Sequence, residues 1–346
     1  MGRRRQVIGV PPPPPVQVVE HQAQCGWCSY CRRWQEAALD LTGQVVGQGR
    51  FGVRLAALIT QMRMVLRTPI RLIQTWLQQV QGVAVSSGAI RDLLRRVAQQ
   101  GQPHAAQIHA TIQASAAVNA DETTWRERGR QGYIWALATP TGERSFTFRR
   151  SRAGAVINGL LGDDFHGVLT TDFYAGYTDT PGGKHQRCWV HLLRDLHALT
   201  ERYPLSVEVQ AWKDALVDRY QRGKAARGHP RAQQQATRLQ SDLVALAHRA
   251  LDGVTPPCAT LAKRLLCHQG ELFTFLTAPG VEPDNNAAER AVRPLVVMRK
   301  ISGGSRSPQG TATHMTLASL VQTWLAQGRN PLTEVQQLFQ SPFPQL

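Results

Sequence analysis

Three stretches of sequence decide the fold: Ala116-Ala-Val-Asn-Ala-Asp121, Gly132-Tyr-Ile-Trp-Ala-Leu-Ala138 and Arg144-Ser-Phe-Thr-Phe-Arg149. The first is a short apolar run that ends in an aspartate, and the third alternates polar and apolar residues with the period of a strand. Thr139-Pro-Thr-Gly142 separates the second stretch from the third and is typical of a turn. We therefore predict an antiparallel meander of three strands.

The residues that follow predict a helix and a further strand. Residues 153–161 have a helical pattern, with Ser151 as a candidate cap, and Gly167-Val-Leu-Thr-Thr171 is a buried strand that ends in Asp172. Helical periodicity then dominates from about residue 190 to 270. The order βββαβα, with carboxylates at the ends of the first and fourth strands, predicts an α/β fold of the ribonuclease-H-like type.

Residues 49–112 have a helical pattern instead. Apolar residues recur at steps of three and four from Phe51, a second helix is expected from Thr68-Pro69, and a third after Ser86-Ser87, with Gly82 between the last two. Two helices joined by a short Gly-containing turn form a helix-turn-helix arrangement. We predict a helical, helix-turn-helix-like DNA-binding region here; the alternative is a helical bundle with an arginine-rich outer face. The expected DNA-binding residues on the third helix are Arg91, Arg95 and Arg96.

The charge of the chain favours a polyanionic partner. The 346 residues include 40 Lys plus Arg against 24 Asp plus Glu, a formal net charge of +16. Nucleic acid is the commonest such partner, and a solvated cationic surface is the alternative. No stretch approaches the ~18 consecutive apolar residues of a membrane helix, and the N-terminus lacks the apolar centre of a signal peptide. We therefore expect no membrane partner and a cytoplasmic location at the bacterial nucleoid.

The N-terminal region has two parts. Residues 1–20 are expected to form a flexible Pro-rich arm, because five consecutive prolines favour polyproline II. Residues 21–48 contain a Cys cluster and a connector, and a cytosolic protein is expected to keep its cysteines reduced. The candidate Zn²⁺ ligands of this possible zinc knuckle are His21, Cys25, Cys28 and Cys31. Because a second ligand pair is missing nearby, a degenerate knuckle or free thiols are the alternatives.

Carboxylates at strand ends suit the chemistry of phosphodiester bonds. Two divalent metals ~3.5–4 Å apart clamp the attacking and leaving oxygens, so their carboxylate ligands are expected about 4–8 Å apart. Asp121 and Asp172 each follow a strand, although an aspartate there is also a common turn former or cap. Asp284, Asn285 and Asn286 are good helix caps, which puts a third acid, Glu289, in the first turn of a helix. The structural alternative for Glu289 is an i,i+4 pair with Arg293.

Basic residues surround this third acid. They continue into a loop of small residues, Ser302-Gly-Gly-Ser305, that could approach phosphates closely. The expected DNA-binding residues of this region are Arg290, Arg293, Arg299, Lys300 and Arg306.

Cys188 and His191 form a C-x-x-H pair after the second aspartate. Zinc would need more ligands, and only the remote Cys258, Cys267 and His268 offer themselves. We therefore favour a packing or site-supporting role over a bound metal. Trp189, between them, is expected in the core.

Several blocks of this sequence resemble the signature blocks of the insertion-sequence-66 family of DDE transposases, from about residue 20 to near the C-terminus. They are Ser86-Ser-Gly-Ala-Ile90, Asp121-Glu-Thr123, Thr171-Asp-Phe-Tyr-Ala-Gly-Tyr177, Cys188-Trp-Val-His-Leu-Leu-Arg-Asp195, Asn285-Asn-Ala-Ala-Glu-Arg-Ala-Val-Arg-Pro294 and Arg299-Lys-Ile-Ser-Gly-Gly-Ser-Arg-Ser307. Thr124 departs from a common Gly. Family members are often longer at the N-terminus, so this chain resembles a large transposase subunit that is shortened there.

The resemblance implies an organisation and an activity. It implies a helical DNA-binding region over 49–112, a catalytic domain over 113–200 and 276–325, a helical insertion over 200–275 and a C-terminal tail over 326–346. The implied catalytic and metal-binding residues are Asp121, Asp172 and Glu289, holding Mg²⁺ with Mn²⁺ as a substitute. Water would attack at the transposon end, and the freed 3′-hydroxyl would attack target DNA.

The resemblance also implies partners. They are double-stranded DNA at the transposon ends and at the target, further copies of the chain in a homo-oligomer when ends are synapsed, and accessory transposition proteins. The alternative is a non-catalytic or domesticated DNA-binding protein; a ribonuclease-H-like resolvase or ribonuclease would lack the helix-turn-helix region and the arginine motifs.

Overall fold

The chain divides into two compact units. The computed structural model describes residues 6, 8–9, 11–47, 49–178, 180, 183–254 and 256–340, so that part of the expected N-terminal arm lies outside the described residues. Unit 1 consists of Met1–Gln100 and Pro331–Leu346, and unit 2 of Gly101–Asn330. The helix α3 (Ser87–Gln113) runs through the boundary between them.

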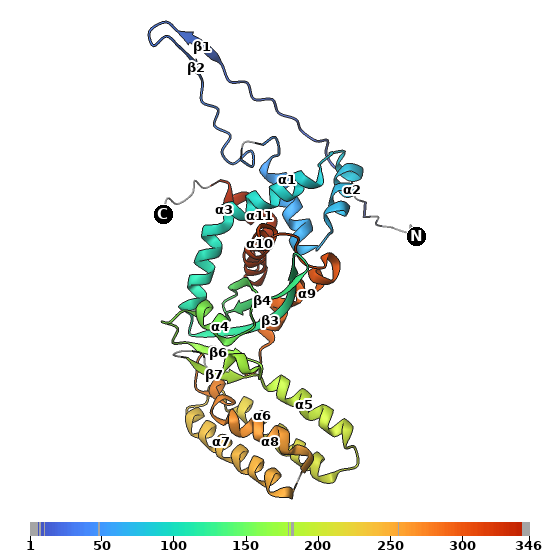
Figure 1. Cartoon of the computed structure of the whole chain (residues 1–346), viewed down its shortest axis with the longest axis vertical. Helices are drawn as coiled ribbons and strands as arrows, with labels where there is room; N and C mark the ends of the chain where they lie inside the picture. Colours follow the sequence, from blue (N-terminus) through green and yellow to red (C-terminus); the bar gives the residue numbers. More distant parts are fainter. Residues whose placement is uncertain are drawn as a thin grey trace, which may run out of the picture. The chain divides into compact units, whose positions relative to one another are not determined.

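Unit 1 contains a hairpin and a group of helices. The hairpin pairs β1 (Cys25–Cys28) with β2 (Arg33–Glu36) in antiparallel register. The helices are α1 (Val53–Thr60), which continues into a π-helical turn, α2 (Ile70–Gln81), the first part of α3, and α11 (Pro331–Leu338), which packs against α1 (Figure 1). The three helices expected over 49–112 are therefore present. Residues 331–338 of the expected C-terminal tail form α11.

The connection between α2 and α3 follows the local sequence. Gly82 ends α2 with a φ of +65°, a left-handed conformation that favours glycine. Ser86 then accepts a hydrogen bond from the Ala89 N–H at 3.1 Å and caps α3. Ile73, Leu77 and Ile90 from the two helices are fully buried.

Unit 2 is built on a five-stranded mixed sheet. Its elements are β3 (Ala117–Glu127), β4 (Arg130–Ala138), β5 (Arg144–Arg149), α4 (Gly154–Leu161), β6 (Val168–Thr171) and β7 (Lys184–Arg187). The strand order is β5-β4-β3-β6-β7; β5, β4 and β3 are antiparallel neighbours, whereas β6 and β7 run parallel to β3. The predicted meander, helix and fourth strand are confirmed, and β7 is an additional strand that was not predicted.

Helices pack on one face of the sheet and along its β5 edge. α3 and α4 contribute to a core over the central strands, and its largest buried residues are Ile112, Trp135, Ile157, Leu161, Phe165 and Tyr177. At the β5 edge, α10 (Pro308–Ala326) supplies hydroxyl acceptors to backbone N–H groups: Phe146 N–H donates to Ser319 Oγ and Arg144 N–H to Thr323 Oγ1, both at 2.9 Å. These backbone N–H groups of the edge strand therefore have hydrogen-bond acceptors although no further described strand pairs with β5.

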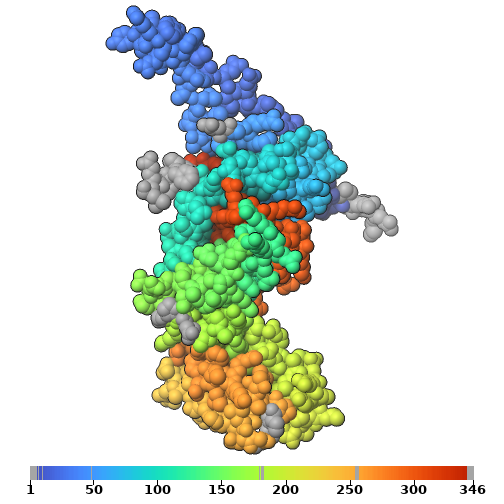
Figure 2. Space-filling model, in the orientation of Figure 1, coloured from blue at the N-terminus to red at the C-terminus, as the bar shows by residue number. Residues whose placement is uncertain are grey.

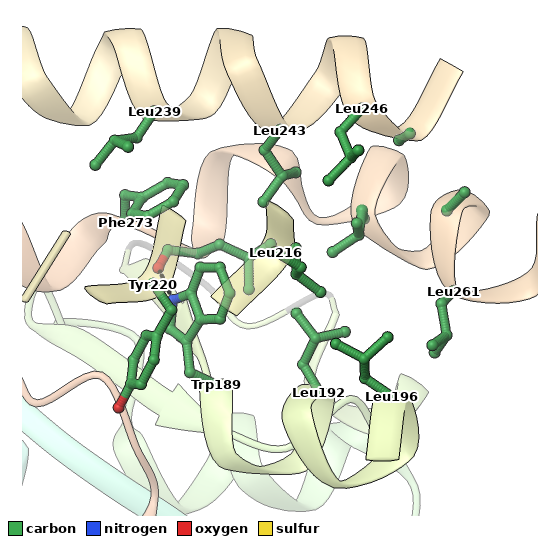
Figure 3. Close-up of a cluster of buried hydrophobic side chains, with 14 of the residues drawn as sticks. Trp189, Leu192, Leu196, Leu216, Tyr220, Leu239, Leu243, Leu246, Leu261 and Phe273 are labelled. Carbon is green, nitrogen blue, oxygen red and sulfur yellow. Dashed lines mark hydrogen bonds between the residues drawn. The ribbon is translucent and has the colours of Figure 1, made fainter. Parts of the chain in front are cut away.

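Between β7 and α9 (Asn286–Ser302) the chain forms a separate group of helices. They are α5 (Trp189–Arg202), α6 (Val207–Ala226), α7 (Ala232–Arg249) and α8 (Ala259–Cys267), and together they fill one body, yellow-green to orange in Figure 2. Their leucines interdigitate around Trp189 (Figure 3). Trp189 is fully buried, stacks on Tyr220 with ring centroids 5.1 Å apart and donates to the Leu272 carbonyl at 2.5 Å. The expectation that Trp189 lies in the core is confirmed.

α9 returns the chain to the sheet, where it contacts β3 and β4. It ends at Gly303, whose φ is +69°, and the loop then pairs with the end of β3 through Ser305 N–H to the Arg126 carbonyl at 2.8 Å. A Cβ at Gly304 would lie 2.1 Å from that carbonyl, so the small residue permits this close approach. None of the described helices combines the length and the apolar composition needed to span a bilayer.

Candidate functional site

Asp121 lies inside β3 rather than at its end. The prediction that the strand stops at this aspartate is wrong, because β3 continues to Glu127 through its antiparallel pairing with β4. The parallel pairing with β6, however, stops at Asn119↔Thr170. Asp121 therefore lies just beyond the parallel part of the sheet, where the neighbouring strand has already ended.

Asp172 follows β6 directly, as predicted. Its carboxylate accepts a hydrogen bond from the Tyr174 N–H at 2.9 Å, and its carbonyl accepts one from Arg187 Nη1 at 3.0 Å. Extending the register Asn119↔Thr170 by two residues brings Asp121 level with Asp172. The negative charge of Asp172 contributes to the raised pKa of Asp121, in agreement with this placement.

Glu289 lies in the first turn of α9, as predicted. The start of this helix is fastened to β3 by Asn285, which is 1% exposed. Asn285 Nδ2 donates to the Ala120 carbonyl at 2.8 Å, and its Oδ1 accepts from Asn119 Nδ2 at 3.0 Å. Because these strand residues directly precede Asp121, the contacts hold the first turn of α9 beside that aspartate.

Burial and the neighbouring acids act on the carboxyl group of Asp121. Burial raises the pKa of Asp121 to about 7, and the negative charges of Glu122, Asp172 and Glu289 add to this effect. Like charges disfavour a further ionised carboxylate nearby, and a divalent cation would relieve the repulsion. Asp121 therefore lies within electrostatic reach of both Asp172 and Glu289.

The closest group of candidate ligands is a different one. Among the described residues, the ligand atoms of Cys188, His191 and Glu289 all lie within 4.8 Å of one another, a condition that the predicted triad does not meet. His191 Nδ1 lies 3.5 Å from Glu289 Oε1. Glu289 forms no ion pair with Arg293 in the part of the chain that the structure describes, so the simple i,i+4 pair is not present.

Glu122 is a member of the site that the sequence analysis did not single out. Its side chain is 4% exposed and accepts hydrogen bonds from Arg152 Nε at 2.7 Å and from the Tyr177 hydroxyl. The Arg152 guanidinium in turn lies 3.7 Å from the centre of the Tyr174 ring. Because the Tyr174 N–H binds the Asp172 carboxylate, this network links β3 to the loop that positions Asp172. The only feature of the sequence that could have drawn attention to Glu122 is its position next to Asp121.

Buried charge also holds the end of β7. Arg187 is fully buried and donates to Glu271 Oε2 at 2.5 Å and to Thr171 Oγ1 at 3.0 Å, beside the start of the Asp172 loop. Burial alone would raise the pKa of Glu271, but the hydrogen bonds from His268 and Arg187 outweigh it and lower the pKa to about 2. Glu271 is therefore the ionised partner of Arg187.

The basic residues predicted to bind DNA divide into two groups in unit 2. Arg290, Arg293 and Lys300 are exposed and follow one face of α9 at steps of three and seven residues; we name these three residues the α9 basic row. Arg306 is also exposed, in the loop after α9. Arg299 faces β3 instead, where its Nη1 donates to Thr123 Oγ1 at 3.1 Å and to the Thr124 carbonyl at 2.6 Å.

In unit 1, the predicted arginines lie on α3. Arg91 is exposed, whereas Arg95 and Arg96 both pair with Asp92 on the same helix, the latter at 2.7 Å. Part of their charge is therefore neutralised within the helix.

The N-terminal Cys cluster lies on the β1–β2 hairpin. The Cys31 N–H donates to Cys28 Sγ at 3.5 Å, and this hydrogen bond lowers the pKa of the Cys28 thiol. Although all four residues are described, no three of the ligand atoms of His21, Cys25, Cys28 and Cys31 lie together within 4.8 Å. Zinc at this cluster stays a prediction.

Comparison with known proteins assigns the chain to a family. It is 29% identical over 294 residues to the uncharacterised protein y4qI of Sinorhizobium fredii (strain NBRC 101917 / NGR234). The matched region covers 72% of this chain and 52% of that protein. It is 30% identical over 169 residues to y4jO of the same organism, covering 48% of this chain and 49% of the relative. The chain thus spans about half the length of the curated relatives it matches. Residues 48–313, which include the carboxylates, the C-x-x-H pair and the α9 basic row, match the family model described as "Transposase IS66 family". The chain belongs to the IS66 transposase family.

Proposed function

We propose that this chain is a DNA transposase whose unit 2 is a ribonuclease-H-like catalytic domain. The order and direction of the five strands support such a domain, as does a helical insertion between the second aspartate and the glutamate. The observation that carries the proposal is the placement of the three acids: Asp121 is level with Asp172 in the register of β3 and β6, and Asn285 fastens the start of α9, which carries Glu289, to the residues before Asp121. The reaction is strand cleavage at transposon ends followed by strand transfer to target DNA.

The cofactor that we propose for these carboxylates is a divalent metal. Asp121, Asp172 and Glu289 would hold Mg²⁺, or Mn²⁺ in its place, because hard cations prefer carboxylate oxygens. A cation would also offset the burial and the neighbouring negative charges that raise the pKa of Asp121. When bound, the metal supplies charge neutralisation at the scissile phosphate and a polarised oxygen nucleophile.

The protein's own contribution is to fix the positions of these carboxylates. Asn285 holds the first turn of α9 against β3, and therefore holds Glu289 near Asp121. Glu122, through Arg152 and Tyr174, does the same for the loop of Asp172. Such supporting contacts matter because productive geometry tolerates errors of only about 0.5 Å.

The α9 basic row gives the site a contact for the DNA backbone. It begins with Arg290, the residue after Glu289, so its charges extend along the helix from the acid. Positive side chains at this place bind phosphates without reading sequence. Arg91 of α3 offers a second cationic position on the expected helix-turn-helix region. Synapsis of two ends requires further copies of the chain, and accessory proteins belong to the same proposal.

A cleavage assay tests the proposal. The full chain would be incubated with Mg²⁺ and a duplex carrying the DNA that flanks its gene, and nicked strands would be separated on a denaturing gel. We expect cleavage by the unmodified protein, none by the Asp121→Asn variant, and equal DNA binding by both in fluorescence anisotropy. Asp164→Asn, an exposed acid outside the site, is the matched control.

Two outcomes contradict the proposal in different ways. Cleavage that persists in Asp121→Asn would show that the carboxylates are not the catalytic residues. Tight DNA binding without cleavage by the unmodified protein would instead support the second candidate, a non-catalytic DNA-binding protein derived from a transposase.

A further inference from the structure

The C-x-x-H pair gains a third partner in the folded chain. Cys188 is the cap residue that precedes α5, and His191 lies in the first turn of that helix, so that their side chains share one side of the helix start. Glu289 reaches the same place from α9. The ligand atoms of all three lie within 4.8 Å of one another, and no other group of three among the described residues does so.

Two atoms of this group are buried and unsatisfied. Within the described part of the chain, His191 Nδ1 and Glu289 Oε1 are shielded from solvent and have no hydrogen-bond partner, although they lie 3.5 Å apart. Buried polar atoms are nearly always paired, and a bound ion is one of the ways in which such atoms are satisfied in folded proteins. The other atom of the group, Cys188 Sγ, belongs to a fully buried residue.

We propose that Cys188, His191 and Glu289 bind a transition-metal ion of the Zn²⁺ class. Sulfur and imidazole ligands select zinc-like ions, whereas Mg²⁺ takes oxygen ligands alone. Three protein ligands with a fourth position open to water is a common zinc arrangement. With bonds of about 2.0–2.3 Å, ligand atoms around a tetrahedral zinc lie about 3–4 Å apart, so movements of about 1 Å complete the site.

The backbone around Cys188 is already fixed for this role. The Cys188 N–H donates to the Thr171 carbonyl at 2.9 Å, and the Trp189 N–H donates to the Pro283 carbonyl at 2.9 Å. Cys188 Sγ accepts the Asn285 N–H at 3.2 Å. The thiol is thus held between the end of β6 and the start of α9, which lowers the conformational entropy lost on metal binding.

Glu289 would then belong to two sites. If the proposed transposase activity is correct, a zinc-class ion at Cys188 and His191 withdraws Glu289 from Asp121 and Asp172, and so inhibits Mg²⁺-dependent cleavage. This consequence rests on the proposed function, whereas the binding of the ion does not. The two are therefore tested by separate measurements.

Cobalt absorption tests the site without reference to activity. The full chain with Cys25, Cys28 and Cys31 replaced by serine, which silences the N-terminal cluster, would be titrated with Co²⁺ in excess Mg²⁺. We expect one Co²⁺ per chain, with the near-ultraviolet charge-transfer band of a thiolate ligand. Cys188→Ser should abolish the band, and His191→Ala and Glu289→Gln should weaken binding at least about 10-fold. Cys267→Ser, which removes an exposed thiol, is the matched control and should keep the band.

A titration without a thiolate band, or a band that persists in Cys188→Ser, overturns the proposal. If Cys188→Ser proves unfolded by circular dichroism, Glu289→Gln decides, because this side chain is 39% exposed and tolerates the change; unaltered Co²⁺ affinity then overturns the site. Failure of Mg²⁺-dependent cleavage with an intact cobalt band would contradict the proposed function and leave the metal site standing.

Discussion

Replacing Asp121 by asparagine is expected to stabilise the metal-free protein, and the gain should grow with pH. Burial and the neighbouring acids raise the pKa of Asp121 from 3.8 to about 7. At 1.36 kcal/mol per unit, a shift of about 3 units destabilises the folded state by about 4 kcal/mol once the carboxyl is ionised. Asparagine has nearly the same shape without the charge, so it removes this destabilisation.

The direction of the pH dependence follows from proton binding. Between pH 3.8 and about 7 the folded protein holds the Asp121 proton while the unfolded chain has lost it. Stability therefore falls as pH rises through this window, and the loss is complete above it. At pH 8 the variant should be about 4 kcal/mol more stable than the unmodified protein, and at pH 5, about 1.2 units above the unfolded pKa, about 2 kcal/mol more stable.

Urea unfolding in EDTA at the two pH values measures this difference. Tryptophan fluorescence monitors unfolding, and its reporters in unit 2 include the buried Trp125, Trp135 and Trp189. Asp164→Asn, at an exposed position, is the control and should change stability by no more than about 0.5 kcal/mol at either pH. Adding Mg²⁺ at 100 times its dissociation constant should stabilise the unmodified protein by about 2.7 kcal/mol and Asp121→Asn by less. A gain for Asp121→Asn that is absent, or equal at both pH values, would refute the electrostatic account of the site.

Four further predictions address the surroundings of the carboxylates. Asn285→Ala removes the two hydrogen bonds that join the Asn285 side chain to the Ala120 carbonyl and to the Asn119 amide, and it leaves that amide only the Asp284 carbonyl at 3.4 Å. It should destabilise the protein by about 2–4 kcal/mol in urea unfolding; a change below 0.5 kcal/mol would contradict the fastening role. Glu271→Gln leaves the buried Arg187 without its counter-charge and should cost about 3–5 kcal/mol at pH 7. Because the pKa of Glu271 is lowered to about 2, this difference should shrink as pH falls from about 4.5 towards 2, and a constant difference would speak against the ion pair. Replacing the three residues of the α9 basic row by alanine should reduce the slope of log Kobs against log salt by about 2.7, and an unchanged slope would remove the row from the DNA interface. Gly304→Ala should lower the unfolding midpoint, because its Cβ meets the Arg126 carbonyl at 2.1 Å, whereas Gly270→Ala, with open space around its Cβ, should be milder.

The parts of the sheet that could be predicted are those with a local hydrophobic pattern. β4 and β5 follow from apolar runs and alternation, and their bounds agree closely with the predicted stretches. β7 has no such pattern, because Lys184-His-Gln-Arg187 is polar. Its burial depends on partners almost 90 residues later: Gln186 Oε1 accepts the Phe275 N–H at 2.9 Å, and the His185 carbonyl accepts the Thr274 hydroxyl at 2.6 Å. No local rule anticipates such pairing.

The length of β3 was underestimated for a related reason. The apolar run stops at Asp121, but the strand continues because β4 pairs with it as far as Glu127 and because the Ser305 loop joins its end. The second half of β3 is thus stabilised by backbone pairing rather than by a continuous apolar face. The prediction that a strand leads up to Asp121 is confirmed, and the prediction that the strand ends there is wrong.

The same limit applies to the site. Asp121, Asp172 and Glu289 could be chosen as candidates because each stands in a recognisable local context, after an apolar run or at a helix start. The approach of Glu289 to His191 could not be predicted from local sequence, because 98 residues (289 − 191) separate the two in the chain. A C-x-x-H pair without further ligands favoured a packing role, and the folded chain brings a third candidate ligand, Glu289 of α9, to this pair.

Asn285 links the two groups of ligands around Glu289. Its side chain binds β3 at Ala120 and Asn119, on the side of Asp121, while its backbone N–H binds Cys188 Sγ, on the side of His191. Its carbonyl accepts the N–H of Glu289, one turn into α9. A single buried residue therefore sets the distance of Glu289 from both groups. It follows that loosening Asn285 should weaken Co²⁺ binding at Cys188 and Mg²⁺ binding at Asp121 together, whereas Glu122→Gln, which acts through the Asp172 loop, should affect the Mg²⁺ site alone. Equal effects of the two substitutions on both metals would show that the groups are not organised by separate contacts.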